Sequence, residues 1–567
     1  MSHRNTKISA LVLGAFSVYV QTIMLREIFA AYGFSELLFA IILFFWLFCG
    51  GLGSYTYRKG SIPNQFAILG IWGIFIPLIV RVIAVLLRPQ LGITVPITIV
   101  IITGALSSLL AIFVGRTFAA LAKLGDAHKL YALEGIGSFT GGILSILFVG
   151  FLSRSFLILI AFALLVPIYT AGIKAMIRYI VIIAVGTFII TFSIPEMNKL
   201  LWKGYEASEL ESHYGRITLV SREGENYIYE NGKLIASQSD TLSSEQIVHP
   251  VMWAHPNPKK VLLIGGIFNG AGIDIIKHNP DSLFLPFMDR KLIASAIARL
   301  PSIRNFWDQQ NLYPIYSEPR QFLRNSDTKF DVIFSMPGFP NTGGDNRFWT
   351  VEWFDALRKH LHKNGIIAVE IPVGANFLSE YQQELCASIW KTFHYVFPES
   401  EIYFLDGAIL MVSHPQSSLN LRQKLINKKN FRQINTATIN PQYLPMLFQK
   451  QRSETLTRQL NSAKFARINR NWHPMVYLWG ILEQSNLAGA KVPLEIFQNG
   501  ERKSSVILAI ILVILLLLSI IFKKNNFIFW VFASGMWGML AQTLFILIFQ
   551  ANFGNLYWLI GLATGIF

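Results

Sequence analysis

Hydrophobic and polar positions divide this chain into three parts. Long apolar stretches fill the first 194 residues, short apolar runs alternate with polar segments in the middle, and long apolar stretches return near residue 504. Each long stretch approaches the about 20 residues that an α-helix needs to cross a bilayer. We therefore predict an N-terminal membrane domain, residues 1–194, with about seven transmembrane helices near 8–32, 34–57, 65–88, 93–117, 129–152, 155–173 and 176–194.

The C-terminal part, residues 504–567, repeats this apolar pattern. Spans are predicted near 504–522 and 526–549, and a third begins near 555. The chain stops at Phe567 inside an apolar run, which is typical of a truncated reading frame. The stretch GAFSVYVQTIMLREIFAAYG near the start also resembles GMWGMLAQTLFILIFQANFG near the end, which indicates a parallel internal repeat of the kind found in carriers.

The middle part has the pattern of an α/β domain. Alternating residues around Asn231-Gly232 predict a β-hairpin within the linker and subdomain 195–258. Between residues 259 and 414, strands are predicted near 260–266, 283–288, 312–317, 330–336, 366–371, 401–405 and 408–413, and helices near 270–278, 290–300, 348–363 and 377–396. This order predicts a doubly wound parallel sheet that ends in an antiparallel pair. Residues 415–503 are poorly patterned and are expected to form a loosely helical connector.

The predicted fold class is therefore a multi-pass α-helical membrane protein with an inserted domain. That domain is expected to be α/β, Rossmann-like and of the class I methyltransferase type, with a small β-hairpin subdomain before it. The composition agrees, since 53% of residues are hydrophobic, 14% are charged and the mean hydropathy is +0.44. The two cysteines lie far apart, which excludes a disulfide framework and a Cys-based zinc site.

The net charge is +16, and its distribution along the chain bears on the predicted membrane topology. The apolar parts outside 195–503 hold 15 Lys and Arg against 4 Asp and Glu, so the excess is a membrane-topology signal and predicts no nucleic-acid partner. We expect the protein to lie in the inner membrane of the cell. The positive-inside rule then places its N-terminus in the cytoplasm. Seven crossings would then deliver the soluble domain to the outer, periplasmic face. The lipid bilayer is the expected partner.

A glycine-rich loop in KKVLLIGGIFNGAG, residues 259–272, is the first candidate site. Gly265, Gly266 and Gly270 follow a predicted strand and precede a helix, where a nucleotide could approach bare backbone. The same glycines are equally required for a tight strand-to-helix turn. Bulky Ile267 and Phe268 stand where a ligand would lie, and they favour the structural interpretation.

The stretch from Glu211 to His414 resembles the spermidine synthase family, the polyamine aminopropyltransferases. The resemblance rests on ESHYGRITLV, HPVMWAHPNPKKVLLIGG, FDVIF, RFWTVEWFDALRKHLHKNGIIAVEIP and the later NRNWHPMVY. The membrane stretches QTIMLREIFAAYG and LYALEGIGSFTGG resemble those of members fused to transmembrane helices. The resemblance implies a Rossmann-like domain that binds decarboxylated S-adenosylmethionine and a polyamine.

The resemblance also implies where the active residues belong, and several have been replaced. Phe268 stands at the aspartate of the glycine loop, and Phe287 stands at the acid for the ribose hydroxyls. Met336 and Phe339 stand at the catalytic aspartate and its companion. Neither methionine nor phenylalanine can act as a base or hold a cationic amine. We therefore expect a pseudoenzyme with no catalytic residue.

Two acids of the family pattern survive, Asp289 near the ribose position and Glu318 near the adenine position. Together with Gly265, Gly266 and Gly270 they form the predicted vestigial cofactor-binding pocket. Helix capping or a surface role explains both acids equally well. No resident cofactor is expected, and an S-adenosyl nucleoside would bind only if this pocket still works.

Polar residues in the predicted membrane helices form a second set of candidates. Gln21, Arg81 and Glu134 are the residues that we expect to line a route if anything is transported. Arg26 and Glu27 are explained by snorkelling or by pairing with each other. No group of His, Asp and Glu has metal-ligand spacing, so no metal is predicted, and His249 and His255 are interpreted as scaffold histidines.

Three functions remain open from the sequence. The first is an inactive spermidine synthase-like protein that serves as a binding or assembly module, with other membrane or outer-face subunits as partners. The second is an active transferase that acts on an S-adenosyl or polyamine-type molecule. The third is a membrane carrier with a receptor-like domain.

Overall fold

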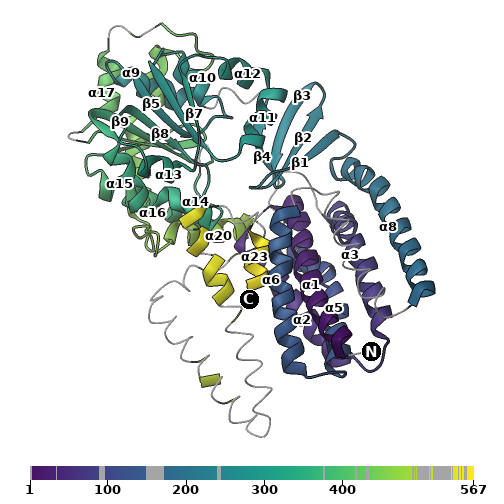
Figure 1. Ribbon diagram of the computed structural model, residues 1–567. Helices are drawn as coiled ribbons and strands as arrows, with labels where there is room; N and C mark the ends of the chain where they lie inside the picture. The colour runs from purple at the N-terminus through teal and green to yellow at the C-terminus, as the bar shows by residue number, and fades with distance from the viewer. Residues whose placement is uncertain are drawn as a thin grey trace. The chain divides into compact units, whose positions relative to one another are not determined.

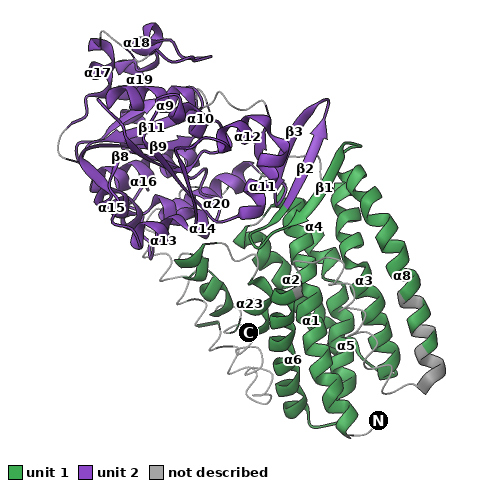
Figure 2. Ribbon diagram, turned by 45° about the horizontal axis from the view of Figure 1, so that its top comes forward, with its two compact units in different colours: residues 1–216, 488–567 green, residues 217–487 purple. Residues whose placement is uncertain are grey.

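The computed structural model divides the chain into two compact units (Figures 1 and 2). The first comprises residues 1–216 and 488–567, and the second comprises residues 217–487. The structure describes residues 3–87 except 34, 96–148, 172–238, 244–487 except 375–376, 416–417, 429–430 and 432, and parts of 489–566. Most residues of the predicted spans at 155–173, 504–522 and 526–549 lie outside the described residues.

Unit 1 is built from long apolar helices. Their bounds are α1 His3–Tyr32, α2 Glu36–Thr56, α3 Ile62–Leu87, α4 Ile97–Ser107, α5 Leu110–Ala122, α6 Ala127–Phe148, α8 Gly172–Leu201 and α23 Ile560–Ile566. Within the described part, five helical segments are long and apolar enough to cross a membrane: Arg4–Tyr32, Glu36–Thr56, Ile62–Leu87, Ile97–Ala122 and Ala127–Leu147. The predicted span at 93–117 is divided into α4 and α5.

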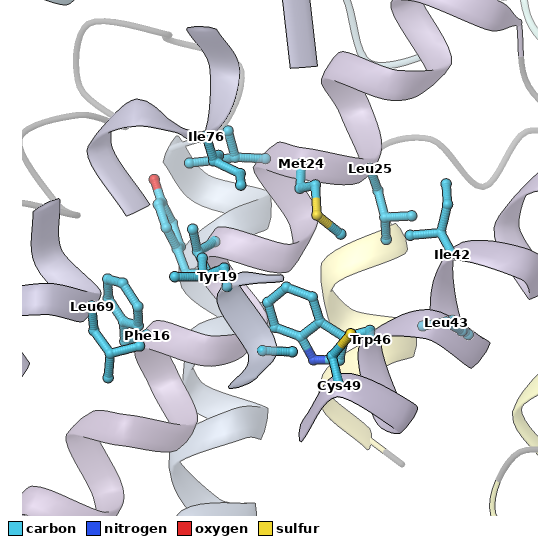
Figure 3. Packing of buried hydrophobic residues seen from close by; sticks show 14 of the residues in the cluster. Phe16, Tyr19, Met24, Leu25, Ile42, Leu43, Trp46, Cys49, Leu69 and Ile76 are labelled. Carbon is cyan, nitrogen blue, oxygen red and sulfur yellow. The ribbon is translucent and has the colours of Figure 1, made fainter. Parts of the chain in front are cut away.

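Helix α1 forms the centre of unit 1. It packs against α6, α3, α5 and α23, and its apolar side chains join those of α2 and α3 in one buried cluster (Figure 3). The contact with α6 is close, since a Cβ added to Gly137 would lie 2.0 Å from the Leu11 carbonyl oxygen. A Cβ on Gly141 would lie 2.4 Å from the carbonyl oxygen of Ala15. The small residues of α6 thus serve helix packing.

The two stretches of the predicted internal repeat end in the same backbone conformation. Gly33 has φ +86° and Gly554 has φ +87°. The Gly33 N–H donates to the Phe29 carbonyl at 2.9 Å, and the Gly554 N–H donates to the Gln550 carbonyl at 3.0 Å. Both are left-handed glycine stops of the type that commonly ends helices.

Unit 1 extends past the predicted domain boundary at residue 194. It includes the rest of α8, strand β1 (Glu206–Glu211) and the residues up to Arg216. The physical reason is a set of ion pairs, described below, that joins this segment to α1 and α3. The hydrophobic pattern could not predict it, because the joining residues are polar.

Unit 2 begins with an antiparallel meander. Its strands are β2 Arg216–Arg222, β3 Glu225–Glu230 and β4 Lys233–Ser237. Asn231 and Gly232 both have positive φ in the two-residue turn between β3 and β4, which confirms the predicted hairpin. A second turn of the same kind, at Glu223 and Gly224, joins β2 to β3.

A seven-stranded sheet forms the core of unit 2. Its strand order is β10-β11-β9-β8-β5-β6-β7. The bounds are β5 Lys260–Gly265, β6 Ser282–Phe287, β7 Leu312–Tyr316, β8 Phe330–Met336, β9 Leu361–Pro372, β10 Glu401–Phe404 and β11 Ala408–Ser413. The pairs from β7 to β9 are parallel, and β11 pairs antiparallel with both β9 and β10. The sheet therefore confirms the predicted Rossmann-like arrangement with an antiparallel end.

The helices that precede or separate these strands are α9 Glu245–Ala254, α10 Ala271–Ile276, α11 Arg290–Arg299, α12 Pro301–Trp307, α13 Pro319–Arg324, α14 Gly343–Asn346, α15 Val351–Lys359 and α16 Glu380–Val396. The four predicted helices correspond to α10, α11, α15 and α16, whereas α9, α12, α13 and α14 were not predicted. The predicted helix 348–363 is too long, because α15 ends at Lys359 and β9 begins at Leu361. Leu361 pairs with Phe330 of β8, and its side chain is buried.

The predicted connector differs from what the structure shows. Residues up to 487 belong to unit 2 and form α17 Leu421–Asn427, α18 Leu444–Leu447, α19 Lys450–Asn461 and α20 Met475–Leu487. Helices α19 and α20 pack on α16. Glu384 of α16 accepts hydrogen bonds from the backbone N–H groups of Lys464 and Phe465. Hydrogen bonds between a side chain and the backbone leave no periodic pattern in the sequence. The hydrophobic pattern therefore could not predict that this segment packs on the rest of unit 2.

Candidate functional site

The carboxyl ends of the parallel strands bring the predicted pocket residues to one edge of the sheet. Gly265 ends β5, Asp289 follows β6, Glu318 follows β7 and Met336 ends β8. Ligands of Rossmann-like domains bind at this edge. We call these residues, with Gly266, the strand-end site.

Met336 covers the glycine loop of the strand-end site. Gly265 and Gly266 have φ +74° and +66°, and a Cβ on Gly266 would lie 2.9 Å from the Met336 sulfur. A Cβ on Gly265 would lie 2.0 Å from the Met336 carbonyl oxygen. Met336 is itself buried. The glycines thus leave room for the neighbouring strand and its methionine, and Gly270, with φ +93°, begins α10.

Aromatic side chains occupy the next position along the edge. The Phe287 ring lies 4.9 Å from the Tyr316 ring and 5.7 Å from the Trp307 ring, in edge-to-face contacts. The Arg290 guanidinium stacks over Tyr316 at 4.1 Å. An acid at position 287 would accept hydrogen bonds from a ribose diol, whereas this cluster offers an apolar surface.

The two surviving acids are engaged in local structure. Asp289 Oδ1 accepts from the backbone N–H groups of Lys291 and Leu292 and caps α11. Glu318 Oε2 accepts from the Gln321 N–H at 2.8 Å and caps α13, and its Oε1 lies 3.2 Å from Nη2 of Arg347. The Arg347 side chain is buried. Capping accounts for both acids, as the sequence allowed.

Further acids near this edge come from the meander and from α14. Burial raises the pKa of the Glu230 carboxyl to about 7, and the charge of Asp289 adds to this effect, while Lys233 opposes it. Burial also raises the pKa of Asp345, against the charges of Lys233 and Arg347. Sequence reasoning missed Glu230 and Asp345, because neither follows a strand of the parallel sheet.

Fold and site together define a Rossmann-like domain of the methyltransferase type. Residues 241–406 match the model of the spermine/spermidine synthase domain. The polyamine aminopropyltransferase of Lachnospira eligens is 26% identical over 196 residues, 34% of this chain and 67% of that protein. The enzyme of the same name from Thermococcus onnurineus is 27% identical over 161 residues, 28% of this chain and 57% of that protein.

The solved spermidine synthase of Thermotoga maritima covers 45% of this chain and 86% of its own, with 19% identity and a TM-score of 0.36. Residues 241–406 thus form a spermidine synthase-like domain. The chain spans between just over half and two thirds of the length of these two curated relatives.

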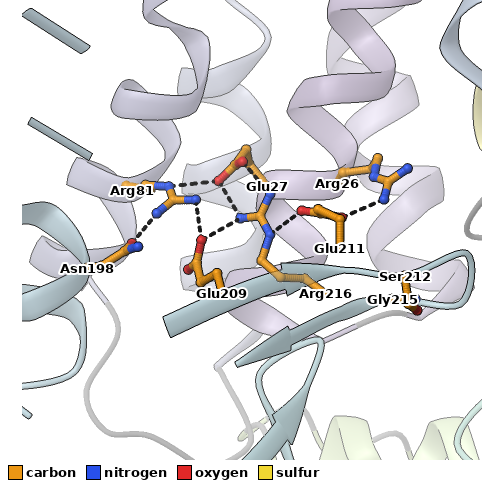
Figure 4. A network of polar contacts seen from close by, with 9 residues as sticks. All are labelled: Arg26, Glu27, Arg81, Asn198, Glu209, Glu211, Ser212, Gly215 and Arg216. Atoms are coloured by element: carbon orange, nitrogen blue, oxygen red, sulfur yellow. Dashed lines mark hydrogen bonds and ion pairs between the residues drawn. The ribbon is translucent and has the colours of Figure 1, made fainter. Parts of the chain in front are cut away.

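Unit 1 contains a buried set of alternating charges around Arg81 (Figure 4). We call it the Arg81 network, and its members are Arg26, Glu27, Arg81, Asn198, Glu209, Glu211 and Arg216. The Arg81 Nε lies 2.9 Å from Glu27 Oε2, and its Nη2 lies 2.9 Å from Glu209 Oε2. Arg81 Nη1 donates to Asn198 of α8.

Arg216 closes the other side of the network. Its Nη2 lies 2.6 Å from Glu27 Oε1, and its Nε lies 2.5 Å from Glu211 Oε1. Arg26 donates to Glu211 Oε2 at 2.6 Å. Burial would raise the pKa of Glu211, but the charges of Arg216 and Arg26 outweigh burial and hold this pKa below its ordinary value.

The network corrects the sequence interpretation of its members. Arg26 and Glu27 are not each other's partners but bind Glu211 and Arg81 respectively, with Arg216 shared. Three arginines thus meet three glutamates in a buried region. Gln21, which is buried, and Glu134, which is half-buried, take no part in the network as far as the structure describes it.

A third group was missed entirely. Glu245 and His249 of α9 meet Asp274 of α10, although no sequence spacing connects Asp274 with the other two. The only available signal was the i, i+4 separation of Glu245 and His249, which puts both on one helix face.

Proposed function

We propose that this chain is a multi-pass membrane protein whose spermidine synthase-like domain does not transfer aminopropyl groups. One observation carries the proposal: Met336 ends β8 and fills the space over Gly266. A catalytic aspartate at that position would hold or deprotonate the attacking amine, and a thioether does neither. The aromatic cluster around Phe287 and the engagement of Glu318 with Arg347 support the same conclusion.

The experiment is an aminopropyl-transfer assay on the purified full chain, with decarboxylated S-adenosylmethionine and putrescine. The aminopropyltransferase of Thermotoga maritima serves as the positive control. We expect no product above background and no saturable binding of S-adenosyl compounds by calorimetry. Product that forms in wild type and is lost when Met336 is replaced by alanine would overturn the proposal.

Membrane insertion is supported by large apolar side chains on the outer faces of the helices. Phe48 of α2, Leu86 of α3 and Phe188 of α8 are 59%, 75% and 65% exposed. In water such a surface would cause association, whereas lipid solvates it. We propose an inner-membrane location with a cytoplasmic N-terminus and the soluble domain on the periplasmic face.

A reporter that is active only in the cytoplasm tests this orientation. Fused near residue 420, it should be inactive, and the same reporter fused to the N-terminus should be active. The opposite pattern would contradict the assignment.

For the domain itself, we propose a role as a binding or assembly module in a membrane complex. A domain that retains its fold and core without the residues of its chemistry is suited to presenting a surface. Gentle solubilisation of native membranes, followed by sizing, should show the chain in an assembly larger than one chain in its micelle. Recovery as a single chain under all conditions would contradict this role.

An active transferase is the second candidate, and one observation favours it. The Glu230 pKa near 7 suits a general base at neutral pH. Product formation from any S-adenosyl or amine substrate that is abolished by Glu230→Gln would favour this candidate. The carrier hypothesis named Gln21, Arg81 and Glu134 as residues that line a route. The Arg81 guanidinium is already paired, so we do not propose transport.

A further inference from the structure

Three metal-ligand groups converge beneath the glycine loop. Glu245 and His249 extend from the same face of α9, and Asp274 extends from α10. His249 Nε2 lies 3.6 Å from Asp274 Oδ1 and 4.0 Å from Glu245 Oε1. One ligand atom of each residue lies within 4.8 Å of the others, and all three side chains are at most 1% exposed. We call this group the Glu245 cluster.

Neighbouring residues form hydrogen bonds with the atoms of these three side chains that face away from the centre of the cluster. Asp274 Oδ2 accepts from Ser244 Oγ at 2.6 Å, and His249 Nδ1 is bonded to His278 Nε2 at 2.9 Å. Glu245 Oε2 accepts from the Thr438 N–H at 2.7 Å and from its hydroxyl at 2.6 Å. Outer contacts of this kind orient the ligands of metal sites. Of the inner atoms, Glu245 Oε1 also accepts from the Ala437 N–H at 3.0 Å, and its second lone pair is the one available to a metal.

His249 Nε2 is the second, independent observation. It is buried and has no hydrogen-bond partner among the described residues, and it points toward two carboxylate oxygens. A buried nitrogen without a partner destabilises the fold, because it loses the hydrogen bond that water would provide. A cation between the three atoms would use this nitrogen and both oxygens together.

Lys277 is the cation that the structure shows. Its Nζ lies 2.9 Å from Asp274 Oδ1 and 3.5 Å from Glu245 Oε1. One ammonium does not neutralise two carboxylates, and as a donor it satisfies only the oxygens. The Lys277 side chain is 31% exposed, so it can turn toward solvent when another cation binds.

We propose that Glu245, His249 and Asp274 bind a divalent transition-metal ion, with Zn²⁺ as the best match, in competition with Lys277. One imidazole and two carboxylates suit a borderline ion better than Mg²⁺ or Ca²⁺, which prefer oxygen ligands alone. The metal would join α9 to α10 directly after the glycine loop. It is a structural site and does not depend on whether the strand-end site is active.

The test uses the full chain in detergent, without a polyhistidine tag, stripped with a chelator and then given ZnCl₂. We expect about one zinc ion per chain after gel filtration, measured by elemental analysis, and a higher unfolding midpoint than in chelator. Lys277→Met should bind zinc roughly tenfold more tightly, because the competing ammonium is removed. His249→Gln should lose the zinc, and His255→Gln, at the end of the same helix, should keep it.

The proposal is overturned if wild type and Lys277→Met retain no more zinc than His249→Gln. It is also overturned if His249→Gln keeps the zinc. Should His249→Gln fail to fold, Asp274→Asn provides the same comparison. The expected increase in zinc affinity of Lys277→Met can be measured even if His249→Gln and Asp274→Asn do not fold. A Lys277→Met protein that is destabilised and not restored by zinc would identify a closed ion cluster instead.

Discussion

The strand-end site and the Arg81 network treat charge in opposite ways. At the strand-end site, a fold suited to charged chemistry holds Met336 and Phe287 where acids are expected, and its remaining acids cap helices. In unit 1, three arginines and three glutamates are buried and paired with one another, although burying a charge costs free energy. The first region has apolar side chains at positions where the family resemblance implies acids. The second keeps its charges, and each charge offsets the cost of burying the opposite charges next to it.

The comparison teaches which retained residues matter for structure. A buried ion pair adds little compared with an apolar pair, but losing one partner leaves a bare charge. The Arg81 network is therefore fragile to single changes. At the strand-end site the glycine loop is covered by Met336, so substitutions there should act through shape more than through charge.

The largest effect is expected for Glu27→Gln. This change leaves Arg81 and Arg216 short of a shared carboxylate in a buried region. We expect unfolding in detergent to become easier by about 3–5 kcal/mol. Glu196→Gln is the matched control, because Glu196 pairs with Lys199 at an exposed position, and its loss should cost at most about 0.5 kcal/mol. Equal effects of the two changes would break the contrast.

Gly266→Ala should be next in size. The new Cβ would meet the Met336 sulfur at 2.9 Å and would sit on a left-handed backbone, for a cost of roughly 2–4 kcal/mol. Gly338→Ala has a similar φ of +81° and no neighbour within 4 Å, so it should cost only about 1 kcal/mol. Chemical denaturation measures both. In a Met336→Ala background, Gly266→Ala should cost no more than Gly338→Ala does in wild type. A larger cost of Gly266→Ala in that background would show that Met336 does not cover the loop.

Glu230→Gln tests the residual acids through pH. Because burial raises the Glu230 pKa to about 7, the folded state holds its proton more tightly than the unfolded chain. Stability from this group is full below about pH 4.5 and is lost as the pH rises through about 7. The variant should therefore gain roughly 3 kcal/mol over wild type at pH 8 and little at pH 4.5. Unfolding midpoints across this pH range provide the measurement, and parallel curves would disprove the shift.

The smallest effect is expected for Asp289→Ala. The change removes the cap of α11 and should cost about 1 kcal/mol of stability. Asp289→Asn keeps a capping oxygen and should cost less. If Asp289→Ala instead abolished binding of an S-adenosyl compound without changing stability, the acid would be a ligand group and the strand-end site would be active.

Periodicity was sufficient to predict most of the fold. Each of the seven strands of the sheet falls within a few residues of its predicted place. The central strands are buried on both faces and therefore read as short apolar runs. The strand-end residues Gly265, Asp289, Glu318 and Met336 were also predictable, since strand ends of a parallel sheet meet at one edge. The helix boundary at Lys359 was not, because Leu361 enters β9 through its pairing with Phe330.

The partners of polar residues could not be read from sequence. Arg81 was a candidate from its position in an apolar helix, but its partners come from α1, α8 and β1, up to 128 residues away. His249 was taken as a scaffold residue because Asp274 lies on another helix.

The sequence by itself determined where most of the helices and strands lie and which residues stand at the strand ends. These are properties of single positions and of local periods, which follow from burial of side chains on one face. Only the tertiary structure decided that Met336 covers Gly266, that Arg81 is paired, and that Glu245, His249 and Asp274 converge. Electrostatic and steric contacts act over a few ångströms between residues that are remote along the chain. The order of residues therefore does not specify them until the fold brings them together.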